Sequence, residues 1–170
     1  MNPFRQITAT LLLLVLTACS FGQAKQWKDS TMLFPKPTGY VNDFEVVLAI
    51  DTYNTLTQMI EAHKKKTTDE IVVVTIPSYE PFGNLADYAK TLSNEWGVGN
   101  KQKNNGVTIV FSKAKREVRI STGLGIKKKL TDTMCQKIID EKMIPAFKEG
   151  DYDEGIVTGV KEIIRILESK

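Results

Sequence analysis

Histidine and cysteine are the residues that this chain has least of. Its 170 residues include one histidine, His63, and two cysteines, Cys19 and Cys135. Zinc and other soft-metal sites need several such ligands, so they are excluded. A Ser-His-Asp or Cys-His arrangement would have to use His63, which shares helical spacing with apolar residues, and the chain has no nucleophile-elbow motif. We therefore interpret His63 as a packing residue at the end of a helix face.

A large excess of one charge is also missing. The chain has 23 Lys and Arg residues against 20 Asp and Glu, a formal net charge of +3. This value is too close to neutral to indicate a nucleic-acid partner. Lysines cluster at Lys64–Lys66 and Lys127–Lys129, but short runs of this kind are usually solvated faces.

The apolar run near the start of the chain is too short to span a bilayer as a mature helix. This run, Leu11–Leu16, follows the single charge of Arg5 and precedes small residues. A basic start, a short apolar stretch and small residues after it are typical of a secretory signal. We therefore predict a signal peptide over residues 1–18.

The end of that segment predicts a lipid anchor. The sequence Leu16-Thr17-Ala18-Cys19 resembles the bacterial lipobox, in which the cysteine is lipidated and becomes the first mature residue. An ordinary signal peptide and an uncleaved anchor are the alternatives. Lipidation of Cys19 would hold the protein on a membrane of the cell envelope, with the outer membrane expected and the domain on the extracytoplasmic side. Cys135 would then be the only remaining thiol, and residues 19–40 would form a flexible tether.

Hydrophobic patterning predicts one α/β domain over residues 41–170. Helices are expected to begin at Asp51, at Asn84 and at Thr131, and a last helix carries an apolar stripe from Ile156 to Leu167; Gly97 should stop the second helix and Pro145 should break the third. Strands are expected over 71–76, 107–111 and 117–121. The first of these strands lacks polar alternation, as a central strand covered on both faces does. The order of elements predicts a three-layer α/β/α sandwich on a small mixed sheet.

The stretch RISTGLGIKKKLTD places two glycines between a strand and a helix. Such a position suits a phosphate-binding loop, but a third glycine and a Ser or Thr after the lysine are missing. A tight turn or a close approach of two backbones is the structural alternative. The rim of a metal site is the third.

Three polar segments suggest an oxygen-rich cation site. VND, KNNG and GLGIKKKLTD are expected to meet at one edge of the sheet, where they would supply Asp43, Asn104, Asn105 and Asp132. Carboxylate, amide and backbone oxygens are the ligands that Ca²⁺ and Mg²⁺ prefer. The structural alternatives are turn formation by Asp43 and the asparagines, and a favourable helix-dipole charge at Asp132.

The order of these segments resembles the TPM domain family over Gly39 to about Ile164. The resemblance rests on GYVNDF, EIVVVTIPSY, YAKTLSNEWGVGNKQKNNGVTIVFSKAKREVRISTGLG, LTD and IPAFKEGDYDEGIVTGV. It implies an α/β/α sandwich that is commonly secreted or membrane-tethered, a divalent-cation site in some members, an acid phosphatase activity proposed for a plant member, and roles near membrane protein complexes. The family's acidic and turn positions fall on Asp43, Asn105, Gly123, Gly125 and Asp132.

One departure from the family pattern bears on function. Where the family tends to have Gly-Tyr-Gly-Leu-Glu, this chain has Gly123-Leu124-Gly125-Ile126-Lys127, so an aromatic residue and a carboxylate are lost. Positive charge here opposes cation binding. We therefore expect a monomeric, non-catalytic binding or assembly module for a membrane protein complex, with a structural Ca²⁺. A divalent-cation-dependent acid phosphatase is the alternative, and contact of the lysine run with anionic headgroups or an acidic partner is a third hypothesis.

Overall fold

Residues 33–169 are described in a computed structural model of the chain. The chain divides into two units at Pro35, and all the helices and strands described here belong to the second unit, which begins at Lys36. The predicted signal peptide and the lipidation site at Cys19 lie outside the described residues. Within residues 33–169, no helix is both long and apolar enough to cross a membrane.

Strands and helices alternate from the first strand to the third, after which the fourth strand and the remaining helical elements follow. The elements in chain order are β1 (Val41–Asp43), α2 (Ile50–Thr67), β2 (Glu70–Thr75), α3 (Leu85–Glu95), β3 (Gly106–Ser112), β4 (Glu117–Thr122), α4 (Asp132–Ile138), the π-helical turn η2 (Ile139–Met143), α5 (Ile144–Lys148) and α6 (Tyr152–Glu168).

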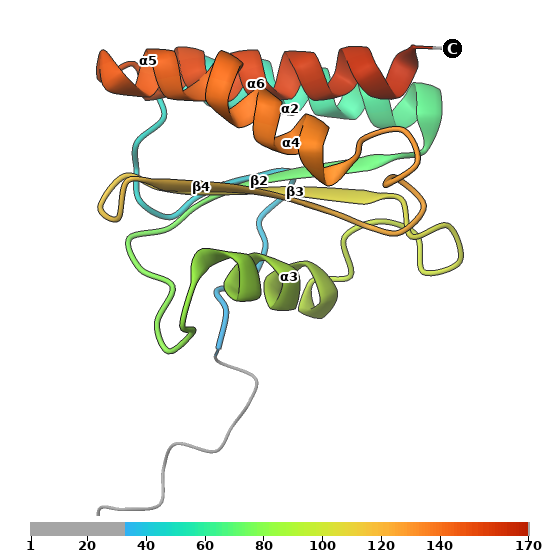
Figure 1. Ribbon diagram of the computed structural model, residues 1–170, viewed down its shortest axis with the longest axis horizontal. Coiled ribbons are helices and arrows are strands. Elements are labelled where there is room, and N and C mark those ends of the chain that lie inside the picture. Colours follow the sequence, from blue (N-terminus) through green and yellow to red (C-terminus); the bar gives the residue numbers. More distant parts are fainter. Residues whose placement is uncertain (1–32, 170) are drawn as a thin grey trace, which may run out of the picture. The chain divides into compact units, whose positions relative to one another are not determined.

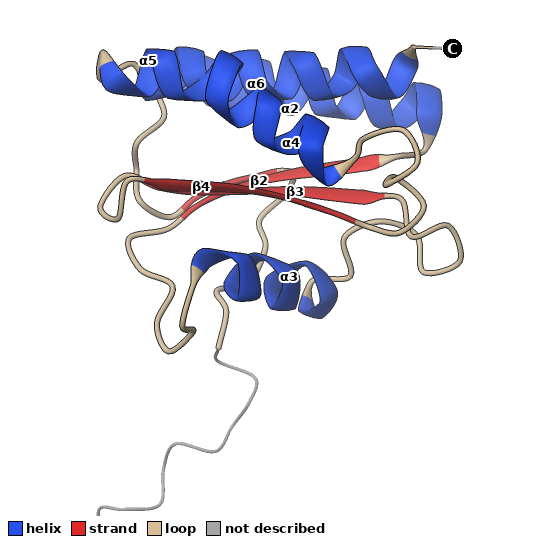
Figure 2. Ribbon diagram, in the orientation of Figure 1, coloured by secondary structure: helices blue, strands red, loops and turns tan. Residues whose placement is uncertain are grey.

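The four strands form one mixed sheet in the order β1-β2-β3-β4. β1, β2 and β3 are parallel, and β4 returns antiparallel to β3 through a tight hairpin. Helix α3 covers one face of the sheet, and α2, α4, α5 and α6 cover the other (Figures 1 and 2). The predicted three-layer α/β/α sandwich on a mixed sheet is confirmed. The sequence analysis missed β1, because three residues carry too little periodicity to mark a strand.

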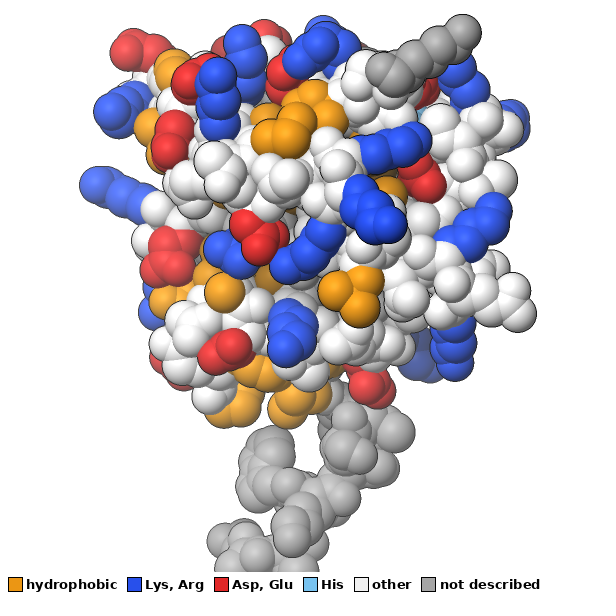
Figure 3. Space-filling model, turned by 45° about the vertical axis from the view of Figure 1, so that its right-hand side comes forward, with side chains coloured by type: hydrophobic (Ala, Val, Ile, Leu, Met, Phe, Trp, Pro, Cys, Tyr) orange, Lys and Arg blue, Asp and Glu red, His pale blue; other side chains and the backbone are white. Residues whose placement is uncertain are grey.

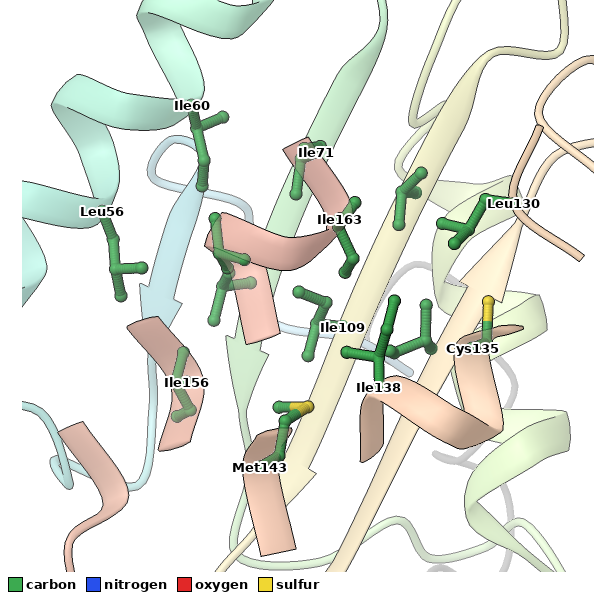
Figure 4. Close-up of a cluster of buried hydrophobic side chains, with 14 of the residues drawn as sticks. Leu56, Ile60, Ile71, Ile109, Leu130, Cys135, Ile138, Met143, Ile156 and Ile163 are labelled. Carbon is green, nitrogen blue, oxygen red and sulfur yellow. The ribbon is translucent and has the colours of Figure 1, made fainter. Parts of the chain in front are cut away.

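The apolar run Ile71–Ile76 forms the centre of the sheet, as predicted. β2 pairs with a parallel strand on each side, and its residues from Ile71 onward are buried on both faces. On the four-helix face, Ile71 and Ile109 of the sheet lie among side chains from α2, α4, η2 and α6 (Figure 4). This layer is the main hydrophobic core, and it holds the sheet and the helices in place.

Local capping residues determine where α3 and α4 begin. The Asn84 side chain accepts a hydrogen bond from the Asp87 N–H (2.8 Å), and the Thr131 hydroxyl accepts one from the Met134 N–H (3.2 Å). Both are the predicted caps. The prediction for Asp51 was wrong: α2 begins one residue earlier, after Ala49, without a side-chain cap. Asp51 lies in the first turn, where its charge suits the helix dipole.

The predicted break at Pro145 was also wrong, because the chain stays helical through it. α4 continues through the π-helical turn η2 into α5, whose first turn contains Pro145. Proline has no N–H to donate, and its ring crowds the carbonyl four residues earlier. A wider turn just before the proline accommodates both effects.

Two chemically reactive side chains are buried structural groups. His63 is 2% exposed, and its Nδ1 lies 3.0 Å from Glu168 Oε1. Cys135 is buried on α4 as predicted, and desolvation raises the pKa of its thiol to about 11. A thiol with so high a pKa is almost entirely protonated at neutral pH and therefore a poor nucleophile.

Thr122 at the end of β4 supplies a test of the packing. Its hydroxyl is buried and has no hydrogen-bond partner among the described residues. Because an unpaired buried hydroxyl costs free energy, we expect Thr122→Val to raise the free energy of unfolding by about 1 kcal/mol. Urea denaturation followed by circular dichroism measures this change.

The same substitution at Thr131 is the matched control. There the hydroxyl caps α4, so we expect Thr131→Val to lower the free energy of unfolding by about 1 kcal/mol. A destabilised Thr122→Val protein would show that the Thr122 hydroxyl is satisfied in solution.

Candidate functional site

The glycine segment of RISTGLGIKKKLTD is a backbone contact and not a phosphate cradle. The Gly123 N–H donates to the Gly106 carbonyl (2.8 Å), and the Gly125 N–H donates to the Asn104 carbonyl (3.0 Å). The Ile126 N–H donates back to the Gly123 carbonyl (3.0 Å). These donors are used inside the protein, so they do not point at a ligand as the N–H groups of a phosphate-binding loop do.

Close approach of two backbones explains why both positions are glycine. A Cβ at Gly125 would lie 1.9 Å from the Lys103 carbonyl oxygen, and one at Gly123 would lie 2.2 Å from the Asn104 carbonyl oxygen. Neither glycine has a positive φ, so conformational freedom is not the reason. The absence of a side chain lets the loop after β4 pack directly on the loop before β3.

The two asparagines of the predicted site shape the loop before β3. Asn104 has φ +49°, in the left-handed region, and its N–H donates to the Asn100 carbonyl (2.7 Å). Asn105 is 4% exposed; its amide oxygen accepts from the Asn100 N–H (2.8 Å) and its amide nitrogen donates to the Thr68 carbonyl (2.8 Å). Asn105 therefore ties this loop to the end of α2.

Lys127 forms an ion pair with Asp132. Its ammonium lies 3.1 Å from Asp132 Oδ2, and both side chains are partly exposed. Asp132 is the first residue of α4, where a carboxylate also suits the helix dipole. The Lys127 ammonium thus supplies the positive charge that the Asp132 carboxylate faces in this structure.

Asp43 lies at one end of the sheet, where the parallel strands finish, and the other predicted ligands lie at the opposite end. It aligns with Thr75 and, through β2, with Phe111 near the end of β3, whereas Asn105 precedes β3. A seven-residue strand spans roughly 20 Å. The expectation that the three segments meet at one edge is therefore wrong for Asp43. Strand β1, which was not predicted, is the reason. It places Asp43 at the carboxyl end of the parallel strands, whereas the loop before β3 lies at their amino end.

The Asp43 carboxylate organises the turn after β1. Its Oδ1 accepts from the Val47 N–H (3.1 Å), its Oδ2 from the Leu48 N–H (2.9 Å), and the Thr75 hydroxyl also donates to it. Asp43 is thus too far from Asn104 and Asn105 to share one cation site with them. No cluster of three or more His, Cys, Asp or Glu suited to a metal occurs in residues 33–169. Binding of Ca²⁺ or Mg²⁺ stays a prediction.

A groove of about 800 Å³ lies between α3 and β4, and some of the predicted site residues line it. Asn104, Gly123 and Asp132 line it together with basic and hydroxyl side chains that sequence analysis did not single out. These are Lys90, Ser93, Lys101, Thr108, Arg119 and Ser121. The sequence carries a signal for Arg119 and Ser121, because polar residues that alternate with Val118 and Ile120 indicate an outward face of the strand expected over 117–121.

A second groove, of about 910 Å³, lies beside the hairpin end of β4. Its apolar wall includes Phe111, Phe147 and Tyr152, with ring centroids 4.7 Å apart for the first two and 5.4 Å for Phe111 and Tyr152. The Lys113 ammonium lies 4.9 Å from the centroid of the Tyr152 ring. Both grooves are large enough to hold several side chains of a ligand.

Comparison with known proteins identifies the family. The family model described as the TPM domain matches residues 41–166. The chain belongs to the TPM domain family. No curated protein matched it. The structure of the N-terminal domain of a protein from P. gingivalis is 34% identical, with a TM-score of 0.71 over 77% of this chain and 83% of that one.

Two more distant structures share the fold of this TPM domain. The BA42 protein of the psychrophilic bacterium Bizionia argentinensis is 21% identical, with a TM-score of 0.62 over 73% of this chain and 83% of that one. The N-terminal domain of a Corynebacterium glutamicum protein is 14% identical, with a TM-score of 0.60 over 81% and 87% of the two chains.

The loop contact beside the groove predicts the effect of a single methyl group. Gly125→Ala would push the Ala Cβ into the Lys103 carbonyl, so we expect a loss of about 2 kcal/mol in the free energy of unfolding. Gly83→Ala is the matched control, since a Cβ there meets nothing within 4 Å, and it should change stability by less than about 0.5 kcal/mol. Equal urea midpoints for the two variants would contradict the close approach.

Proposed function

We propose that this TPM domain is a lipid-tethered binding module of the bacterial envelope, without a catalytic role. The observation that carries the proposal is the pair of large grooves that follow one another along β4. Their walls offer basic, hydroxyl and aromatic side chains, which suit recognition of another macromolecule. The carboxylates expected to do chemistry are instead engaged in internal hydrogen bonds and an ion pair.

The position of the domain in the chain supports a tethered role. The lipobox-like sequence ends at Cys19, and the TPM match begins at residue 41. About twenty residues between them would let a monomeric domain reach on the order of 25 Å from the membrane surface. We propose that the domain lies on the extracytoplasmic side of the outer membrane and docks on a membrane protein or complex there.

Lipidation is tested by feeding bacteria that express the full chain an alkyne-tagged fatty acid. We expect the wild-type protein to incorporate the label and to begin at Cys19 in mass spectrometry, and Cys19→Ala to incorporate none. Cys135→Ala is the matched control and should be labelled like the wild type. A labelled Cys19→Ala protein, or an unlabelled wild type, would overturn the tether.

The phosphatase alternative requires one cation at Asp43 and Asp132. Because these residues lie at opposite edges of the sheet, we expect no calcium-dependent turnover of p-nitrophenyl phosphate. In amide NMR spectra, added Ca²⁺ should not shift the signals around Asp43 and Asp132 along one shared binding curve. Turnover that Asp43→Asn and Asp132→Asn both abolish would replace the binding module with an enzyme.

A further inference from the structure

The outer edge of β4 is an open edge of the sheet. β4 is the last strand in the order, and it pairs only with β3 among the described residues. In an antiparallel pair, alternate residues turn their backbone groups away from the partner strand. The hydrogen bond from the Gly123 N–H to the Gly106 carbonyl shows that the backbone groups of Gly123 face β3, and it therefore shows which alternate residues of β4 face away. Val118, Ile120 and Thr122 therefore turn their N–H and C=O groups away from β3. Val118 and Thr122 are half-buried, but Ile120 is only 3% exposed, so neighbouring side chains have to move aside before a strand can pair there.

The two grooves flank this edge along its length. Ala86 and Arg119 line both of them, so the grooves adjoin at the middle of β4. The groove toward α3 carries hydroxyls and lysines, and the groove toward α5 carries the aromatic wall of Phe111, Phe147 and Tyr152. The grooves follow one another along β4, so an added strand would contact the hydroxyls and lysines at one end and the aromatic wall at the other.

The charge around the edge is strongly positive, although the whole chain is nearly neutral. Seven Lys or Arg residues line the two grooves, against Asp87, Glu117 and Asp132. Each of these acids already accepts a hydrogen bond, from Asn84, Tyr79 and Lys127 respectively. Figure 3 shows Lys and Arg side chains spread over the face that it draws, with Asp and Glu side chains between them.

Most of the basic side chains are unpaired. Within residues 33–169, none of the following forms an ion pair: Lys90, Lys101, Arg116, Arg119 and Lys148. The carboxylates of a ligand bound at this edge could form ion pairs with these Lys and Arg side chains, whereas a basic ligand would be repelled.

We propose that the open edge of β4 binds an extended, acidic segment of a partner protein by strand addition. This inference rests on the proposed binding function and names its ligand class. Backbone groups of the segment would pair with Val118, Ile120 and Thr122, its carboxylates would face Arg119 and the lysines, and an apolar side chain would enter the aromatic groove. β1, the other edge strand, is only three residues long and offers a poorer template.

Charge also decides between the possible occupants. The chain's own residues 20–32 contain Lys25, Lys28 and one acid, Asp29, so they have the wrong sign for this edge. A second copy would bring an identical basic edge against the first. A foreign acidic segment is the occupant that the charges favour.

The probe is a fluorescein-labelled peptide that alternates Glu with Val and Phe over ten residues, titrated into the purified full chain. We expect saturable binding that weakens with salt, and no binding of the same peptide with Lys in place of Glu. Arg119→Glu should weaken binding about tenfold. Lys161→Glu, the same charge change at an exposed position of α6, should alter it by less than about twofold.

Backbone pairing is measured separately from charge. Peptide binding should slow amide hydrogen exchange at Val118, Ile120 and Thr122, and Val118→Pro should abolish this protection because it removes an outward N–H without breaking a bond to β3. Equal binding of the Lys peptide, an unaffected Arg119→Glu protein, or protection elsewhere would overturn the proposal. So would protection without peptide that depends on residues 20–32 or grows with protein concentration.

Cross-linking in cells separates this inference from the proposed function. A photoreactive amino acid replaces either Ser121, which lines the groove beside Arg119, or Lys161 in the full chain. A specific envelope partner cross-linked from Lys161 and not from Ser121 would overturn docking at β4 and leave the binding function standing. No partner from either position would count against both.

Discussion

The direct backbone contact between the Gly123–Gly125 turn and the Lys103–Gly106 loop organises the end of the domain where β3 begins. Two hydrogen bonds join the loops, at 2.8 and 3.0 Å, and the missing side chains let them approach. The contact ends β4 and directs the chain toward the Thr131 cap of α4. It also forms the rim of the groove beside α3. The segment that resembles a phosphate-binding loop therefore has a structural role, because it holds the loop after β4 against the loop before β3.

Two acidic side chains in this TPM domain accept hydrogen bonds from the N–H groups of turns. Asp43 holds the turn after β1, and Glu45 accepts from the N–H groups of Lys113 and Ala114 at the β3–β4 hairpin, both at 2.8 Å. Carboxylates used in this way stabilise loops by charge-assisted hydrogen bonds. They have fewer lone pairs left for a cation, which is consistent with a binding role for the domain.

The unequal cover of the sheet produces the surface on which the proposed function depends. Four helices and the π-helical turn pack on one face, but α3 alone covers the other (Figure 2). The β4 side of the sheet therefore borders open grooves, and its outward backbone groups have no neighbouring strand among the described residues. The basic residues around it come from α3, the loop before β3, the hairpin, β4 itself, the loop after β4 and α5.

The sequence by itself determined the local structure of this protein. The β-branched run of β2, the caps Asn84 and Thr131 and the helical stripe of α6 depend on short-range patterns, and each was predictable. Pro145 and Asp51 were not, because neighbouring packing and turn geometry overrode the local signal. Only the tertiary structure determined at which end of the sheet Asp43 lies, since its position depends on the pairing of the three-residue β1 with β2. It also decided that basic residues of α3 and α5 gather at β4, because these elements are far apart in the sequence and only the fold brings them together.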